Sequence, residues 1–230
     1  MIPVADENPR SRTPHVTFAI LGACALSFLW QLTLGGDGQR AVVALGVIPA
    51  VLLGHAQLPQ DLAWVPAPVT MVTSMFLHGG WMHFLGNMLY LWIFADNVED
   101  TMGHARFAVF YVACGLVAAL AQALPSPEST IPMIGASGAI SGVLGAYLLL
   151  YPKAKVRVIV PLGIVMQMMR LPAWIVLALW FALQLIQNAF AQSGGGGVAF
   201  RAHIGGFVAG VVLLPLFGLK GLWGARSRPG

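Results

Sequence analysis

Long apolar stretches separated by short polar segments dominate this sequence. A helix needs about 20 mostly apolar residues to cross the hydrocarbon core of a bilayer, because it rises about 1.5 Å per residue. Six stretches meet or approach that length. We therefore predict six membrane-spanning helices in one domain, at residues 15–34, 80–94, 107–124, 137–151, 173–191 and 202–219.

The segment between the first two predicted spans, 35–79, is too long and too apolar for a plain loop. Its core, 41–53, has the length of an interfacial or re-entrant piece, and Pro49 interrupts it. The pattern thus predicts an all-α membrane protein, a six-helix bundle with a long interfacial first loop. Residues 15–219 form the membrane domain, flanked by tails at 1–14 and 220–230.

The amino-acid composition also indicates a protein embedded in a lipid bilayer. Of the 230 residues, 58% are hydrophobic and only 9% are charged, whereas roughly 25% of residues are charged in an ordinary soluble domain. The net charge of +4 does not indicate nucleic-acid binding, because the basic residues lie in short loops and tails. Cys24 and Cys114 lie in apolar runs with no His or Cys at ligand spacing, so they predict no metal site.

The distribution of Lys and Arg predicts the orientation. If the N-terminus is cytoplasmic, ten basic residues fall on the inner side and only Arg40 and Arg201 fall outside. Cytoplasmic loops carry the excess of basic residues, so both tails are predicted to be cytoplasmic. No small-residue cleavage pattern closes the first apolar run, which favours an uncleaved helix over a signal peptide.

Four polar side chains lie inside the predicted spans: His83 and Asn87 in the second, Ser137 in the fourth and His203 in the sixth. A charge at the centre of a span costs about 2.5–3.5 kcal/mol, so polar residues there need an explanation. In the predicted orientation these three helices all begin on the outer side. The four residues therefore converge at one depth, just below the outer surface.

Small residues indicate how two of these helices meet. Stripes of Gly at four-residue spacing let helix backbones approach closely in lipid. Packing the two stripes together would bring Ser137 beside His203, a nucleophile within reach of a base. Ser137 also begins its helix, where free backbone N–H groups and the positive dipole end suit an oxyanion. The packing residues are Gly138 and Gly142 in the fourth span and Gly206 and Gly210 in the sixth.

Each residue alone has a simpler explanation. Ser137 and Ser141 are of a type that often packs helices together, His203 could hydrogen-bond a loop, and His83 with Asn87 could cross-link helices. Their coincidence at one depth favours a single site. A zinc protease helix would need H-E-x-x-H, which is absent, and the acidic residues lie in tails, loops or span ends. A Ser-His dyad without a carboxylate remains.

Three motifs then resemble those of the rhomboid intramembrane serine proteases. "GASG" (135–138) resembles the family's G-x-S-G, "HFLGN" (83–87) its H-x-x-x-N, and "AHIGGFVAG" (202–210) its A-H-x-x-G-x-x-x-G. They occur in the family's order and on the expected helices.

The resemblance implies roles for these residues. Ser137 would be the nucleophile and His203 the general base, while His83, Asn87 and the Ser137 backbone N–H would stabilise the oxyanion. Glu99 and Gly103 in "VEDTMG" would brace the inner end of the second helix. The family implies no cofactor and no metal, transmembrane protein substrates cut near the outer boundary of a bacterial inner membrane, and lipid as the only other partner.

Two features depart from the family's pattern. Val69 and Thr70 stand where some rhomboids have Trp-Arg, and Ser141 stands where many have an aromatic ring that stacks on the catalytic histidine. The sequence thus leaves open how His203 is oriented. A catalytically inactive relative that escorts membrane proteins is the alternative function, and a small-molecule transporter is a third.

Overall fold

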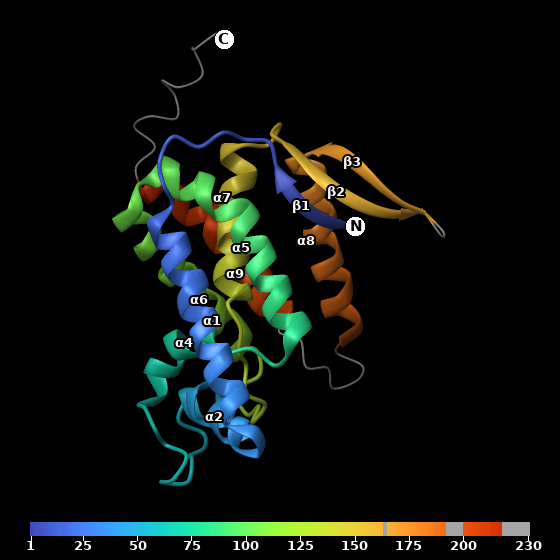
Figure 1. The fold of residues 1–230 in the computed structure, drawn as a ribbon. Helices are drawn as coiled ribbons and strands as arrows, with labels where there is room; N and C mark the ends of the chain where they lie inside the picture. The colour runs from blue at the N-terminus through green and yellow to red at the C-terminus, as the bar shows by residue number, and fades with distance from the viewer. Residues whose placement is uncertain (163–164, 192–199, 218–230) are drawn as a thin grey trace.

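The computed structural model describes residues 1–162, 165–191 and 200–217. Helices form at all six stretches where the apolar pattern predicts them (Figure 1). They are α1 (His15–Thr33), α5 (Trp81–Met102), α6 (His104–Ala123), α7 (Ser137–Leu150), α8 (Ala173–Ala191) and α9 (Phe200–Leu213).

Among the described residues, three helices are long and apolar enough to cross a membrane by length and composition. They are His15–Thr33, His104–Ala123 and Phe200–Phe217, the last including the short 3-10 helix Leu214–Phe217. Ser137–Leu150 and Ala173–Gln187 are shorter apolar helices. A mostly helical membrane protein follows from these observations.

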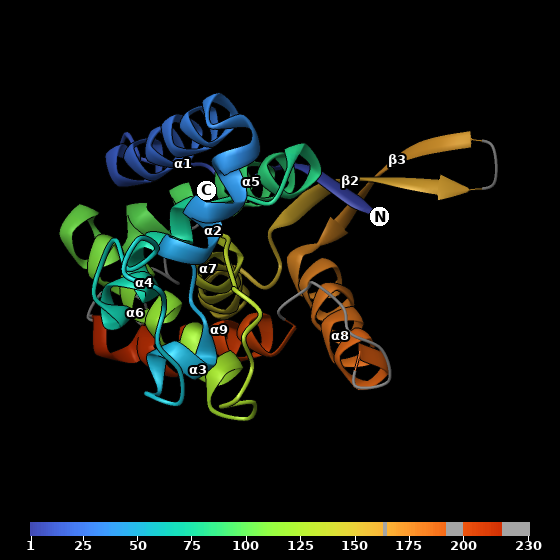
Figure 2. The same ribbon diagram turned by 90° about the horizontal axis from the view of Figure 1, so that it is seen from below.

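Helix α7 occupies the centre of the bundle, where α5, α6 and α9 pack against it (Figure 2). Every residue from Ala139 to Tyr147 is buried, which explains why the sequence there is apolar on all sides of the helix. The helix ends before Pro152, which lacks the N–H that a continuing helix requires. Helix α8 lies at the edge of the bundle, mainly against α9.

The glycine stripes let α7 and α9 approach to backbone contact, as the sequence predicts. A Cβ added at Gly206 would collide with the carbonyl oxygen of Gly138, and one added at Gly210 with that of Gly142. These neighbours are backbone atoms, which cannot rotate away. Glycine is therefore required at this crossing, and the crossing sets the start of α9 beside the start of α7.

The helix at the second predicted span is longer than the sequence indicates. Helix α5 continues beyond Phe94 to Met102, because its acidic residues find partners on the N-terminal segment. The buried Glu99 accepts hydrogen bonds from the backbone N–H groups of Val16 and Thr17 at 2.9 and 2.7 Å, and so caps α1. The helix ends at Gly103, whose φ of +79° favours glycine.

The prediction of an all-α fold is wrong in one respect, because three strands form an antiparallel sheet at one end of the bundle (Figures 1 and 2). The strand order is β1-β2-β3, so the N-terminal strand β1 pairs with the first strand of the β2–β3 hairpin. Within the hairpin, Arg157 lies opposite Arg170. Val156 and Val158 are buried on either side of Arg157. This alternation of β-branched and polar residues was the missed signal. The strands are β1 (Ile2–Asp6), β2 (Lys155–Leu162) and β3 (Val165–Pro172).

The long segment after α1 folds into short helices at the end of the bundle opposite the sheet (Figure 1). Pro49 starts a new helix, as its interruption of the apolar run suggests. Whether this segment lies in the membrane surface stays a prediction. The helices are Gly35–Asp37 (3-10), α2 (Gly38–Leu45), α3 (Pro49–Leu52), Ala67–Val69 (3-10), α4 (Thr70–Thr73) and Ser74–Phe76 (3-10).

Candidate active site

Ser137 and His203 form a direct hydrogen bond, with 2.8 Å between Ser137 Oγ and His203 Nε2. Ser137 is the first residue of α7, and His203 lies in the first turn of α9. The two residues are 66 positions apart in sequence, and the backbone contact between the glycine stripes brings them together. The structure therefore joins a hydroxyl to an imidazole in the arrangement that activates a serine nucleophile.

Helix α5 contributes His83 and Asn87 to the same region. The backbone N–H of Gly79 donates to His83 Nδ1 at 3.2 Å, so the ring proton of a neutral His83 is on Nε2. That nitrogen lies 2.6 Å from the Cβ that any residue other than glycine would have at position 135. His83 Nε2–H therefore faces the chain next to Ser137.

Asn87 is buried one turn further along α5. Its side-chain nitrogen donates to the carbonyl oxygen of His83 at 3.0 Å. An amide nitrogen has two N–H groups, so one remains for another acceptor. Asn87 lines the same cavity as His83, Ser137 and His203, and all four residues predicted from the sequence thus gather at one site.

The turn before Ser137 depends on Gly135. Its φ of +120° lies in a region that other residues rarely adopt, and its N–H donates to the carbonyl oxygen of Ser74 at 2.8 Å. The preceding chain is anchored by hydrogen bonds in both directions between Met133 and Val47. Glycine at 135 therefore permits both the turn into α7 and the close approach of His83.

A cavity of about 870 Å³ opens over these four residues. It continues between α5 and α8, where the rings of Tyr90 and Trp180 lie 6.5 Å apart. Its size suits a stretch of polypeptide rather than a single water molecule. The other lining residues are Gln39, Val42, Pro49, Gly79, Met82, Gly86, Gln122, Ser126, Ser129, Ile131, Pro132, Met133, Ile134, Ile140 and Leu144.

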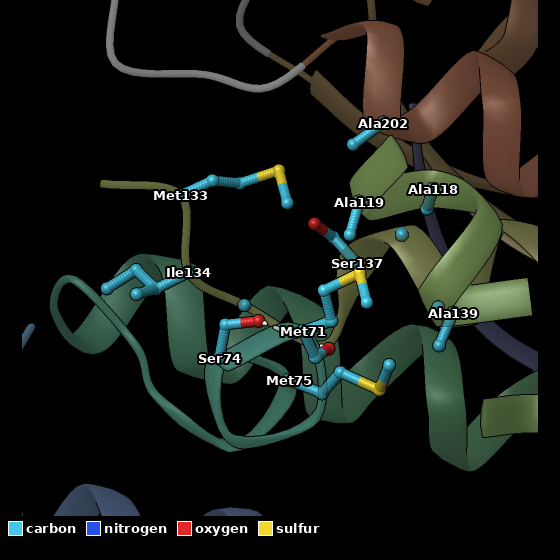
Figure 3. Close-up of a pocket in the computed structure, with 13 residues that line it drawn as sticks. Met71, Ser74, Met75, Ala118, Ala119, Met133, Ile134, Ser137, Ala139 and Ala202 are labelled. Atoms are coloured by element: carbon cyan, nitrogen blue, oxygen red, sulfur yellow. Dashed lines mark hydrogen bonds between the residues drawn. The ribbon is translucent and has the colours of Figure 1, made fainter. Parts of the chain in front are cut away.

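A second, much smaller cavity of about 20 Å³ also adjoins Ser137 (Figure 3). Met133, Ser137 and Ala202 surround it from three segments of the chain. The remaining lining residues are small or apolar apart from Ser74. This volume holds about one water molecule or one small side chain.

His203 makes two contacts that the sequence analysis missed, both with α8. Its Nδ1 lies 2.7 Å from Gln184 Oε1, and its ring centre lies 6.0 Å from that of Trp180. Ser141, where many rhomboids have an aromatic ring, instead donates to the carbonyl oxygen of Ser137 at 2.6 Å. The sequence signal for these contacts was the pair Trp180 and Gln184, a large aromatic residue and a polar one at i, i+4 spacing in an apolar stretch.

His78 packs against His83 and does not line the cavity. Its ring packs edge-on at 5.3 Å from that of His83, and neither ring nitrogen has a hydrogen-bond partner among the described residues. Burial, aided by the neighbouring His83, lowers the pKa of His78 to about 4, so the ring is neutral near pH 7. Its contacts with Phe28 and Phe84 indicate a packing role.

The acidic residues that might have completed a triad lie elsewhere. Asp96 pairs with Arg10 at 2.8 Å, and Glu99 caps α1, both toward the sheet end of the bundle. Within the described ranges, no three or more His, Cys, Asp or Glu side chains gather as metal ligands would. The glycine-rich composition of "QSGGGG" (192–197) predicts a flexible connection before His203, and these residues lie outside the part of the chain that the structure describes.

Comparison with known proteins finds a family model and several curated relatives that match this chain. The model of the Rhomboid domain family matches residues 66–220. The chain is 30% identical over 143 residues to RHOMBOID-like protein 5 of Arabidopsis thaliana, covering 62% of this chain and 43% of the relative. It is 32% identical over 136 residues to Rhomboid protease GluP of Bacillus subtilis (strain 168), covering 59% and 24%.

A third relative, Rhomboid protein 1, mitochondrial, of Saccharomyces cerevisiae (strain ATCC 204508 / S288c), is 28% identical over 193 residues, covering 76% of this chain and 52% of the relative. The matched region thus spans about half the length of these relatives or less. The domain match covers more than half of this chain and includes His83, Ser137 and His203. This chain belongs to the rhomboid family.

Proposed function

We propose that this protein is an intramembrane serine endopeptidase that cleaves transmembrane segments of other membrane proteins. The observation that carries the proposal is the 2.8 Å hydrogen bond between Ser137 Oγ and His203 Nε2 at the edge of a large cavity. Family membership supports it, since relatives include proteins named as rhomboid proteases.

The reaction follows from this pair. Ser137 Oγ attacks the carbonyl carbon of the scissile peptide bond while His203 Nε2 takes the hydroxyl proton. His203 then returns the proton to the leaving amine, and the peptide C–N bond breaks to give an acyl-enzyme. A water molecule, deprotonated by the same histidine, hydrolyses the ester and restores the Ser137 hydroxyl.

Three donors are available for the oxyanion of the tetrahedral intermediate. They are His83 Nε2–H, the second N–H of the Asn87 amide and the backbone N–H of Ser137, which lies in the first turn of α7 and has no acceptor within the helix. The dipole of α7 adds a positive end at the same place. Donors fixed before the reaction need no reorganisation as the charge develops.

In the membrane, we assign six spans with both termini cytoplasmic, as in a bacterial inner-membrane protein. The cavity then opens toward the outer side, and the sheet lies on the inner side. Arg157 and Arg170 lie on this sheet near Glu7, at the end that carries most of the basic residues. Their excess on that side supports the orientation.

Transmembrane substrates would reach Ser137 between α5 and α8, where Met82, Tyr90 and Trp180 line the cavity. A substrate helix hides its carbonyl groups in its own hydrogen bonds, so it must unwind before attack. Glycine, proline or other weak helix formers near the cut favour this step. The small cavity beside Ser137 suits a small residue at the carbonyl side of the cut.

The test uses purified protein in liposomes with a fluorescently labelled transmembrane substrate. Wild type should cleave it, and Ser137→Ala should abolish cleavage, because no other group replaces the hydroxyl. Ser27→Ala, on helix α1 away from the cavity lining, is the matched control and should retain activity. Cleavage by Ser137→Ala at the wild-type rate would contradict the assigned nucleophile.

The same assay addresses the alternative function. A catalytically inactive escort would bind the substrate without cutting it, and Ser137 would not react with a fluorophosphonate probe. The hydrogen-bonded Ser137–His203 pair favours the protease, because an escort has no use for an activated hydroxyl.

A further inference from the structure

Helix α8 presents two side chains to His203, one turn apart on the same face. Gln184 Oε1 lies 2.7 Å from His203 Nδ1, and the Trp180 ring centre lies 6.0 Å from the imidazole with an angle of 38° between the planes. The imidazole is therefore held between Ser137 on one edge and Gln184 on the other, with the tilted Trp180 ring beside it.

The burial of Gln184 fits a specific partner. Its side chain is only 8% exposed, whereas its neighbours Leu183, Leu185 and Ile186 are exposed. A buried amide without a partner costs about 1–3 kcal/mol, so a polar residue turned inward among apolar ones needs a hydrogen bond. His203 supplies it.

The chemistry of the contact decides which nitrogen carries the proton. A glutamine carbonyl oxygen can only accept, so His203 Nδ1 must be the donor in this hydrogen bond. In a neutral imidazole, Nε2 then has a free lone pair, which is the state that accepts the proton of Ser137 Oγ. The opposite tautomer would point an N–H at the hydroxyl and could not act as its base.

We propose that Gln184 is a positioning residue that fixes the Nδ1–H tautomer and the orientation of His203, in the place that a carboxylate takes in a Ser-His-Asp triad. This inference rests on the proposed function of Ser137 and His203. An amide carbonyl oxygen accepts the Nδ1–H as a carboxylate oxygen would, and so orients the base.

The first measurement does not depend on activity. In protein labelled with ¹⁵N-histidine in micelles, two-bond ¹⁵N–¹H couplings distinguish the tautomers, and the His203 signals are those missing from His203→Ala. Wild type should show the Nδ1–H form, and Gln184→Met, similar in length without an acceptor, should lose it. The Nε2–H form in wild type, or no change in Gln184→Met, would overturn the proposal.

The second measurement is kinetic. Gln184→Met should lower kcat on the order of 10–100-fold, by analogy with the loss of a partner that orients a metal-bound histidine, while KM stays within about two-fold of wild type. Gln184→Glu should restore most of kcat, since a carboxyl oxygen can accept the same hydrogen bond. Gln187→Met, an exposed glutamine on the same helix, is the matched control and should behave as wild type.

These variants separate the two claims. If wild type and Ser137→Ala are both inactive, the proposed function fails, and the tautomer measurement still tests Gln184. If wild type cleaves and Gln184→Met matches its kcat, Gln184 has no positioning role while the protease assignment stands. A loss in Gln184→Met that Gln184→Glu does not restore would also contradict the proposal, because it would indicate packing rather than hydrogen bonding.

Discussion

At the scale of single residues, hydrogen bonds from the backbone and from neighbouring helices set the protonation of both histidines in the site. Gly79 N–H fixes His83 with its proton on Nε2, whereas Gln184 fixes His203 with its proton on Nδ1. One ring can therefore donate to an oxyanion while the other accepts from Ser137. The two imidazoles differ in role although they share a cavity.

Asn87 provides a prediction at this scale. Asn87→Ala should lower kcat by about 10²–10³-fold, or about 3–4 kcal/mol of transition-state stabilisation, because a preorganised oxyanion donor is lost. KM should change little, since the ground-state carbonyl carries less charge. Kinetics on the transmembrane substrate would show this, and an unchanged kcat would exclude Asn87 from the oxyanion site.

At the scale of elements, the crossing of α7 and α9 determines whether the site exists. Gly206 and Gly210 contact the carbonyl oxygens of Gly138 and Gly142, and this contact sets the distance between the helix starts. In lipid, dispersion and close backbone packing drive such helix association. The hydrophobic effect does not contribute, because lipid tails are as apolar as the helix side chains. Helix α8, which lies mainly against α9, then adds Gln184.

A methyl group at this crossing should therefore be costly. Gly210→Ala should destabilise the protein by about 1–3 kcal/mol, because the added carbon meets backbone atoms of Gly142 that cannot yield. Gly22→Ala on α1 is the control, since nothing lies within 4 Å of its added carbon. Thermal unfolding in detergent would compare them, and equal midpoints would argue against the tight crossing.

At the scale of the whole molecule, the N-terminal segment links the sheet to the helical bundle. Asp6 ends β1, and Tyr147 in α7 donates its hydroxyl to Asp6 at 2.7 Å. Burial raises the pKa of Asp6 to about 6, and the nearby Asp96 adds to this while the Tyr147 hydrogen bond opposes it. A carboxyl that holds its proton in the folded state makes folding dependent on pH.

The sign of this dependence can be tested. The unfolded chain releases the Asp6 proton near pH 3.9, and the folded protein holds it to about pH 6. Stability from Asp6 is thus complete below about pH 4 and is lost as the pH rises to about 6. Asp6→Asn, which stays neutral, should raise the unfolding midpoint at pH 7 and not at pH 4. An equal gain at both pH values would contradict the raised pKa.

The sequence alone predicted helices at six apolar stretches, because runs of apolar residues reflect a local requirement for burial in lipid or protein. It also predicted that Ser137, His203, His83 and Asn87 would meet, since these polar residues begin helices expected to start on one side. The stripes of Gly206 and Gly210 gave the packing that joins α7 and α9. The helices, the meeting of the four polar residues and the glycine packing can all be predicted because each depends on the spacing of residues along the chain.

Only the tertiary structure decided what each side chain contacts across elements. The length of α5 depends on partners that are distant in sequence, such as Arg10, which pairs with Asp96. Strand β1 forms because it can pair with β2. The hydrogen bond between His203 and Gln184 joins α9 to α8. The length of the chain segment between these helices does not determine which of their residues face each other. Apolar pattern fixes which segments are helical, but hydrogen-bond partners depend on rotation and distance between helices, which the local sequence does not encode.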